Sequence, residues 1–490
     1  MDDRAVRSVP WWADCHRRMT GLREQPRPRI VAARPSTARL TSTVGSYHWL
    51  PRKGIFLTGI EASDPVVDGI RRDQLREARD FRVHGRARLE NIRRLGIRWV
   101  RFGPPYSQVH RGPGSYDWRL WDLVVQTCQE LDIEILADLV HFGLPTWLHA
   151  QTPDQPYWQN AAMPSHVAAY AAAVARRYPS LRYFTPINEP FVTAWFSARI
   201  GLWNEQIARP WTDDRAFVRA ASLAARASIL ARRAIWRVWR DEHRPGAPIF
   251  LQNDSFEEAI AVPGSGREAE VDRFNLARFV ALDLAFGHRD TELRDYVLGE
   301  GLPTDAYEWF MQAGSTDNTL LGIDHYPWCV HTYVADGITH DGPSSPSRLV
   351  PIVIAYAERY GMQDRLLHTE VNGPPSCATA LCRRTYQDIA TLRRLGYAVH
   401  GMGWYGDEVQ VGWQDQLSGP NRYAEYPVGL FRNGQPQPVA TVFGRLARQG
   451  LPHIAAGPAP WSDHPGAGGR SLDGLVSQHT RVRPGGMAAD

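Results

Sequence analysis

Two glutamates in this 490-residue chain have the sequence surroundings of reactive carboxyl groups. Glu189 lies in Thr185-Pro186-Ile187-Asn188-Glu189-Pro190, directly after an apolar run, and its Asn and Pro neighbours favour neither strand nor helix. Glu370 ends a second apolar run and is followed by the turn-forming pair Asn372-Gly373. One protonated and one ionised carboxyl group at the same place can act as a general acid and a nucleophile.

The distance between such a pair decides its chemistry. Carboxyl groups about 5–5.5 Å apart cleave a glycosidic bond with retention through a covalent intermediate, whereas a wider pair admits a water molecule and inverts. Structural roles are the alternatives, with Glu189 as the charge at a helix N-terminus and Glu370 as a surface turn residue. The chemistry therefore requires elements that bring the two residues together.

Short apolar runs alternate with longer amphipathic stretches along most of the chain. The eight predicted strands are Ile55–Ile60, Ile97–Phe102, Ile133–Val140, Arg182–Ile187, Ile249–Gln252, Leu320–Tyr326, Leu366–Val371 and Val399–Tyr405. Helical patterns accompany them, among them Arg86–Leu95, Trp118–Leu131, His166–Tyr178 and Phe217–Trp239. This alternation predicts an α/β protein with a (β/α)8 TIM barrel rather than an open sheet.

Polar residues occur at the C-terminal ends of these strands, where barrels of this kind hold their active sites. They are Glu61, Arg101, Asp138, His141, Asn188, Glu189, Asn253, Asp254, the stretch Asp324 to Tyr326, Glu370 and Trp404. Glu189 follows the fourth strand and Glu370 the seventh, so the barrel would place them across its mouth from each other.

Four motifs in this order resemble those of family 1 glycoside hydrolases, the β-glucosidase-like retaining enzymes of a large clan of (β/α)8 glycosidases. They are Val100-Arg101-Phe102, the segment His141–Leu148, Asn188-Glu189-Pro190, and Thr369-Glu370-Val371-Asn372-Gly373 with one residue inserted before Asn-Gly. Asp324-His325-Tyr326 stands where the family has Asn-Tyr-Tyr. The resemblance runs from about residue 54 to about residue 450 and implies a divergent member.

The resemblance implies hydrolysis of a β-glycoside, with Glu370 as the nucleophile and Glu189 as the acid/base. Arg101 and Tyr326 would hydrogen-bond to Glu370 and favour its ionised form. Burial and the negative charge of Glu370 would keep Glu189 protonated near neutral pH.

The predicted sugar-binding residues match the family less well. Asn188 would bind the 2-hydroxyl of the sugar, and His141 and Trp404 would orient the ring. The family's Gln after the first strand and its Glu-Trp pair near the eighth are missing, and the candidate replacements are Glu61, Asp407 and Gln410. The sequence therefore predicts low activity on simple β-glucosides and higher activity on a modified sugar.

Two other functions fit the same barrel. The first is metal-dependent hydrolysis with Asp138, His141 and His325 as ligands, although the chain has neither a His-x-His nor a His-Glu-x-x-His motif. The second is a non-hydrolytic protein, either a binding protein or a biosynthetic enzyme that transfers or rearranges a glycosyl group.

Composition limits the remaining function classes. With 56 basic and 52 acidic residues, the net charge of +4 indicates neither a nucleic acid nor a membrane surface as a partner. Lys53 is the only lysine and lacks a Gly-rich loop before it, which argues against Schiff-base, PLP and P-loop chemistry. We expect a small-molecule glycoside as the partner and neither a cofactor nor a metal.

The ends of the chain differ from its centre. Residues 1–50 are predicted to form an irregular arm, residues 51–451 the single (β/α)8 domain, and residues 452–490 a disordered tail rich in Gly, Pro and Ser. The chain has no long apolar run and no secretory h-region, and its five cysteines do not suggest a disulfide framework. The expected compartment is the cytoplasm, and no pattern indicates an oligomeric state.

Overall fold

The computed structural model describes residues 51, 53–151, 157–205 and 213–454. The predicted arm (residues 1–50) and the predicted tail from residue 455 onward lie outside the described residues. These two segments and the division into a single domain therefore stay predictions.

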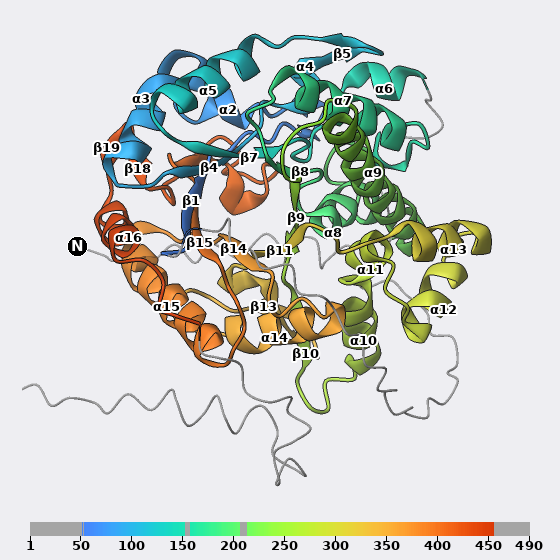
Figure 1. Cartoon of the computed structure of the whole chain (residues 1–490). Coiled ribbons are helices and arrows are strands. Elements are labelled where there is room, and N and C mark those ends of the chain that lie inside the picture. The colour runs from blue at the N-terminus through green and yellow to red at the C-terminus, as the bar shows by residue number, and fades with distance from the viewer. Residues whose placement is uncertain (1–50, 52, 152–156, 206–212, 455–490) are drawn as a thin grey trace, which may run out of the picture.

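Eight parallel strands form the central sheet of the molecule (Figure 1). Their order is β14 (Leu366–Glu370), β11 (Thr319–Asp324), β9 (Ile249–Ser255), β8 (Tyr183–Thr185), β7 (Glu134–Asp138), β4 (Trp99–Phe102), β1 (Ile55–Gly59) and β15 (Gly401–Tyr405). The sheet closes because the His400 N–H donates to the Leu366 carbonyl at 2.7 Å and the Tyr405 N–H to the Val371 carbonyl at 3.0 Å. The predicted (β/α)8 barrel is confirmed, and each predicted strand overlaps an observed one.

Side chains alternate between the inside and the outside of this barrel. Its interior is filled by apolar side chains, namely Ile55, Leu57, Leu136, Tyr183, Ile249, Leu251, Leu320 and Leu367. The outward faces pack against the helices in a larger core. Strands β14 and β15 approach closely at Gly403, where a Cβ would lie 1.8 Å from the Thr369 carbonyl oxygen, so only glycine fits there.

Helices surround the barrel and connect its strands (Figure 1). The four helical patterns predicted above correspond to α3 (Phe81–Arg94), α5 (Arg119–Glu130), α7 (Met163–Arg177) and α9 (Asp214–Asp241). The others on the outer layer are α10 (Glu268–Ala277), α11 (Val280–Phe286), α12 (Thr291–Gly299), α13 (Thr304–Ala313), α14 (Leu349–Tyr360), α15 (Pro375–Arg394) and α16 (Pro438–Gln449). Aspartates cap two of the predicted helices, because Asp80 accepts from the Arg82 N–H and Asp213 from the Ala216 N–H.

Most of the loops that follow the barrel strands at their C-terminal ends carry additional short elements. One is a three-stranded sheet of β10 (Glu258–Ala261), β12 (Val330–Val334) and β13 (Gly337–His340). Others are α8 (Pro190–Ala194), η2 (Trp195–Arg199), η3 (Pro327–Cys329), β16 (Gln410–Val411), η4 (Trp413–Asp415) and β17 (Glu425–Tyr426). The remaining ones are β2 (Val66–Val67), β3 (Ile70–Arg71), α2 (Gln74–Glu77), α4 (Tyr106–Val109), β5 (His110–Gly112), β6 (Ser115–Tyr116), α6 (Thr146–Gln151), η1 (Tyr157–Gln159), β18 (Phe431–Arg432) and β19 (Gln435–Pro436).

The four cysteines within the described residues, Cys128, Cys329, Cys377 and Cys382, are free thiols. None of the helices in the described part of the chain combines the length and the apolar character needed to cross a membrane.

Candidate active site

Glu189 and Glu370 lie at the same end of the barrel. Glu189 precedes α8 with a left-handed backbone conformation (φ 37°), which costs a non-glycine residue about 1–3 kcal/mol and is typical of functional sites. Glu370 is the last residue of β14, and both glutamates are buried. One carboxylate oxygen of each lies within 4.8 Å of the other and of an oxygen of Asp324.

A bulge in β14 turns the Glu370 side chain toward the barrel mouth. Ile323 of β11 pairs with His368 and the next residue, Asp324, pairs with Glu370, so Thr369 is an extra residue in β14. Strict alternation would instead have sent Glu370 outward with Leu366 and His368. The Thr369 hydroxyl donates to Asp324 Oδ1 at 2.5 Å and fixes the bulge.

Both oxygens of Glu370 accept hydrogen bonds from neighbouring side chains. Arg101 Nη1 donates to Oε1, and the Tyr326 hydroxyl donates to Oε2 at 2.7 Å. The Arg101 guanidinium also forms an ion pair with Asp138 at 2.9 Å. Burial alone would lower the pKa of Arg101, but Asp138 and Glu370 outweigh it and hold the pKa well above its usual value. A buried, permanently charged guanidinium therefore faces the carboxylate.

The charged neighbours of Glu189 are mostly negative, in contrast to the Arg101 guanidinium beside Glu370. Burial raises its pKa well above the ordinary value, and the negative charges of Glu370, Asp324 and Asp254 raise it further, while Arg101 opposes them. Glu189 and Glu370 thus have different electrostatic environments although they are neighbours, which is the arrangement that separates an acid from a nucleophile.

Asp324 is a third buried carboxyl group beside the pair. Asn253 Nδ2 and the Thr369 hydroxyl both donate to it. Burial and the charge of Glu370 raise its pKa to about 7. The sequence places Asp324 at a strand end, but only the β11–β14 register shows that it lies beside Glu370.

A chain of hydrogen bonds orders the side chains behind the pair. Asn188 Oδ1 accepts from Arg101 and from Asn253, so the Asn188 amide nitrogen faces His141 Nε2 at 3.0 Å. Because an amide nitrogen only donates, Nε2 accepts and the His141 ring proton lies on Nδ1, 2.9 Å from Asp138. Asn188 is fully buried and does not line the cavity described next, so its contact with a sugar hydroxyl stays a prediction.

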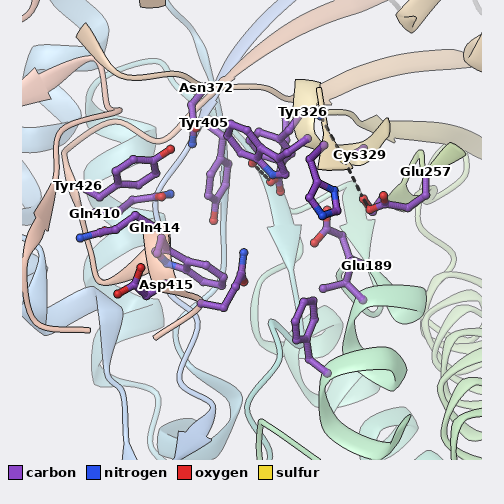
Figure 2. A pocket seen from close by; sticks show the side chains of 18 of the residues that line it. Glu189, Glu257, Tyr326, Cys329, Asn372, Tyr405, Gln410, Gln414, Asp415 and Tyr426 are labelled. Atoms are coloured by element: carbon purple, nitrogen blue, oxygen red, sulfur yellow. Dashed lines mark hydrogen bonds between the residues drawn. The ribbon is translucent and has the colours of Figure 1, made fainter. Parts of the chain in front are cut away.

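Both glutamates line a cavity of about 510 Å³ at the barrel mouth. Figure 2 shows this cavity with Glu189 among its lining residues. Residues of the loop after β15 line one side, and residues after β8, β9 and β11 line the other. The second side is rich in aromatic rings, namely Phe191, Trp195, Phe196, Phe274 and Trp328. The size suits a small ligand with an apolar part, since ligand pockets typically measure about 300–1,000 Å³.

Three of the predicted sugar-binding residues line this cavity. Glu61, His141 and Gln410 all border it, and Gln410 Nε2 donates to Glu61 Oε2 at 3.4 Å. Both ring nitrogens of His141 already have protein partners, which leaves its ring faces and edges for contact with a ligand.

Two other sequence predictions are wrong in this structure. Trp404 does not line the cavity, because alternation along β15 points its ring outward into the core, where Nε1 donates to the Val428 carbonyl at 3.2 Å. Asp407 does not line it either, because Arg88 binds both of its oxygens, at 2.6 and 2.8 Å, and both side chains are only 1% exposed.

Tyr405 and Trp413 border the cavity in their place, and neither is among the sugar-binding residues predicted from the sequence. Tyr405 is the inward neighbour of Trp404 and lies stacked on His141 with 6.2 Å between ring centroids. The strand alternation of Gly401, Gly403 and Tyr405 was the signal that could have identified it, since two glycines on one face mark the crowded inner side.

The alternative metal site of Asp138, His141 and His325 is not assembled. His325 Nδ1 bonds to the Phe256 carbonyl at 2.8 Å. Within the described residues, the one group of three or more ligating side chains close enough to share an ion consists of Glu189, Asp324 and Glu370. The three predicted ligands therefore do not form a common site.

Comparison with known proteins gives matches at the level of structure. No protein-family model matches the chain, and no curated protein matches it in sequence. A family 1 β-glucosidase from Thermotoga maritima matches with a TM-score of 0.62 and 15% sequence identity over 82% of this chain and 99% of that one. The same values describe a Thermotoga maritima family 1 glycoside hydrolase complexed with a cyclophellitol analogue transition state mimic.

A third match, a β-glucosidase from Thermotoga maritima in complex with methyl acetic acid-substituted glucoimidazole, has a TM-score of 0.62 at 14% identity, again over 82% and 99% of the two chains. These likenesses agree with the motif resemblance found in the sequence. The chain described here therefore has the (β/α)8 fold of the family 1 glycoside hydrolases.

Proposed function

We propose that the protein is a divergent family 1 glycoside hydrolase that cleaves a β-glycoside with retention of configuration. The observation that carries the proposal is the closeness of Glu189 and Glu370, whose nearest oxygens lie within 4.8 Å. That closeness is compatible with the separation of about 5–5.5 Å between the carboxyl groups of retaining pairs and favours it over the roughly 6.5–9.5 Å of inverting pairs.

In the first step, a Glu370 oxygen attacks the anomeric carbon while the glycosidic C–O bond breaks. Glu189 donates its proton to the leaving oxygen, for which its raised pKa suits it. Arg101 and Tyr326 hold both oxygens of Glu370 before the substrate arrives, so little reorganisation is needed. The products are a glycosyl ester on Glu370 and the free aglycone.

In the second step, Glu189 has lost its proton and acts as the base. It takes a proton from water while the water oxygen attacks the anomeric carbon and the ester bond to Glu370 breaks. The sugar leaves with its original configuration because two inversions have occurred. Both glutamates return to their starting protonation states.

The cavity walls support a division of the substrate between two sides. The loop after β15, with Tyr405, Gln410 and Trp413, would hold the sugar, and the aromatic side near Phe191 and Trp328 would hold the aglycone. Each lost contact to a buried sugar hydroxyl costs on the order of 1–3 kcal/mol, so the missing family Gln and Glu make simple β-glucosides poor substrates.

The anomeric configuration of the first-formed product tests this proposal. A panel of nitrophenyl β-glycosides is incubated with the enzyme and followed by proton NMR before the product mutarotates, with and without an acceptor alcohol. We expect the β-anomer first, and Glu370→Gln should abolish its formation. An α-anomer as the first product would instead indicate an inverting enzyme. Product formed only with the alcohol would favour glycosyl transfer.

A further inference from the structure

The cavity at the barrel mouth is unusually acidic. Six carboxyl groups line it, those of Glu61, Glu189, Glu257, Asp341, Glu370 and Asp415. Its lining within the described part of the chain includes neither an arginine nor a lysine side chain. Glu189 and Glu370 belong to the reacting pair. The other four carboxylates differ in the partners that the protein provides for their charge.

Glu257 and Asp341, on the aglycone side, have local partners. Ser255 donates to Glu257 Oε1, and His331 Nε2 lies 2.5 Å from Glu257 Oε2. The Asp341 carboxylate is hydrogen-bonded by Ser345 and lies near Arg348. The protein itself therefore supplies hydrogen-bond partners for both of these carboxylates.

Glu61 and Asp415, on the opposite side, have only neutral donors. Glu61 is 4% exposed and accepts from the Ser63 N–H at 2.9 Å and from Gln410. Asp415 Oδ2 accepts from the Asn421 N–H at 2.7 Å. Neither makes an ion pair within the described residues. Neither belongs to a group of three ligating side chains there, so the arrangement does not suit a metal ion.

Buried polar atoms without a protein partner also belong to residues that line this cavity. They are the Tyr405 hydroxyl, the Trp413 Nε1, the Gln414 Oε1 and the Asn372 Oδ1. Tyr405 and Asn372 are each only 3% exposed and border the cavity. Figure 2 shows Tyr405, Gln410, Gln414 and Asp415 together on one side, opposite Glu189 and Glu257. The two amide oxygens only accept hydrogen bonds and the Tyr405 hydroxyl can accept one, whereas Trp413 Nε1 donates, so a donor group on the ligand can satisfy three of these four atoms.

We propose that this side of the cavity binds an amino sugar whose protonated amine faces Glu61 and Asp415. The inference rests on the proposed glycosidase function and specifies its substrate class. An ammonium group offers three donors and no acceptor, which matches the carboxylate and amide oxygens present. It also supplies the positive charge that two carboxylates in a partly closed cavity lack, whereas a neutral hydroxyl donates a weaker bond and leaves that charge uncompensated.

Binding of free sugars tests the inference without requiring turnover. Isothermal titration calorimetry on the full chain would compare glucose with 3-amino-3-deoxy-, 4-amino-4-deoxy- and 6-amino-6-deoxyglucose, at a pH where the amines are protonated. We expect at least one amino sugar to bind tenfold or more tightly than glucose. The Glu61→Gln variant should reduce this preference at least fivefold, because it removes the charge and keeps the shape.

The matched control is Glu425→Gln, which removes a carboxylate on β17 that is paired with Arg432 away from the cavity lining. It should leave the preference unchanged. Glucose binding as tightly as all three amino sugars, a preference unaffected by Glu61→Gln, or no binding of any sugar would each overturn the inference. A failure of the proposed hydrolysis is recognised separately, because it leaves the nitrophenyl glycosides uncleaved while these binding constants are still measured.

Discussion

The hydroxyl of Tyr326 donates a 2.7 Å hydrogen bond to Oε2 of Glu370, while Arg101 binds Oε1. The two donors come from opposite sides of the barrel, since Arg101 lies on β4 and Tyr326 follows β11. They fix the orientation of the carboxylate that we propose to be the nucleophile. Preorganised donors of this kind need not rearrange during the reaction.

Replacing Tyr326 with Phe tests the contribution of this bond. A hydrogen bond to a charged group contributes about 1.5–3 kcal/mol. Because 1.4 kcal/mol corresponds to a factor of ten, kcat/KM for hydrolysis is expected to fall roughly 10- to 100-fold. Folding should be little affected, because the ring that stacks on Trp328 remains. Steady-state kinetics on a nitrophenyl glycoside measure the effect, with Tyr423→Phe, an exposed tyrosine, as the control. A kcat/KM within twofold of wild type would contradict the prediction.

The charge of Asp324 is expected to shift the alkaline limit of activity to higher pH. Glu189 must be protonated for the first step, so activity is lost as the pH rises through its pKa, which burial, Glu370 and Asp324 all raise. The negative charge of Asp324 is one of the causes that raise this pKa. Asp324→Asn removes the charge, lowers the pKa of Glu189 and moves the alkaline limb of kcat/KM to lower pH.

A pH–rate profile of this variant measures the shift. The control is Asp241→Asn, which removes an exposed carboxylate at the end of α9 and should leave the limb in place. A limb that stays where it is, or moves to higher pH, in Asp324→Asn would show that this charge does not act on Glu189.

The ion pair between Arg88 and Asp407 is expected to matter for stability. Both side chains are 1% exposed, so Arg88→Ala leaves a buried carboxylate without its partner. Breaking such a pair typically costs about 3–5 kcal/mol in the free energy of unfolding. Denaturant unfolding should show this loss, and the apolar double variant Arg88→Met/Asp407→Leu should recover much of it. A loss below about 1 kcal/mol would mean that the pair is not a structural element.

The barrel could be predicted from sequence because its strands are short apolar runs between amphipathic helices, and that pattern is local. The motifs around Glu189 and Glu370 were equally local, and the observed closure of β14 against β15 brings them to one rim. The β14 bulge at Thr369 was not predictable in the same way, because it depends on the register against β11.

The errors concern contacts between residues far apart in the chain. The family resemblance points to Trp404 as a sugar-binding residue, although strand parity places Tyr405 at the cavity and Trp404 in the core. The sequence does not reveal that Asp407 pairs with Arg88, because the two residues are 319 positions apart and nothing local links them. Such pairings appear only when the chain is folded.

The role of Glu370 as the nucleophile is tested most directly by azide rescue of alanine variants. Glu370→Ala should hydrolyse a nitrophenyl β-glycoside several orders of magnitude more slowly than wild type. Azide should restore turnover by attacking from the vacated side, and NMR should identify the product as the α-glycosyl azide. Glu189→Ala with azide should give the β-glycosyl azide, because its covalent intermediate still forms on Glu370. Near-wild-type hydrolysis by Glu370→Ala, or a β-glycosyl azide from that variant, would contradict the account.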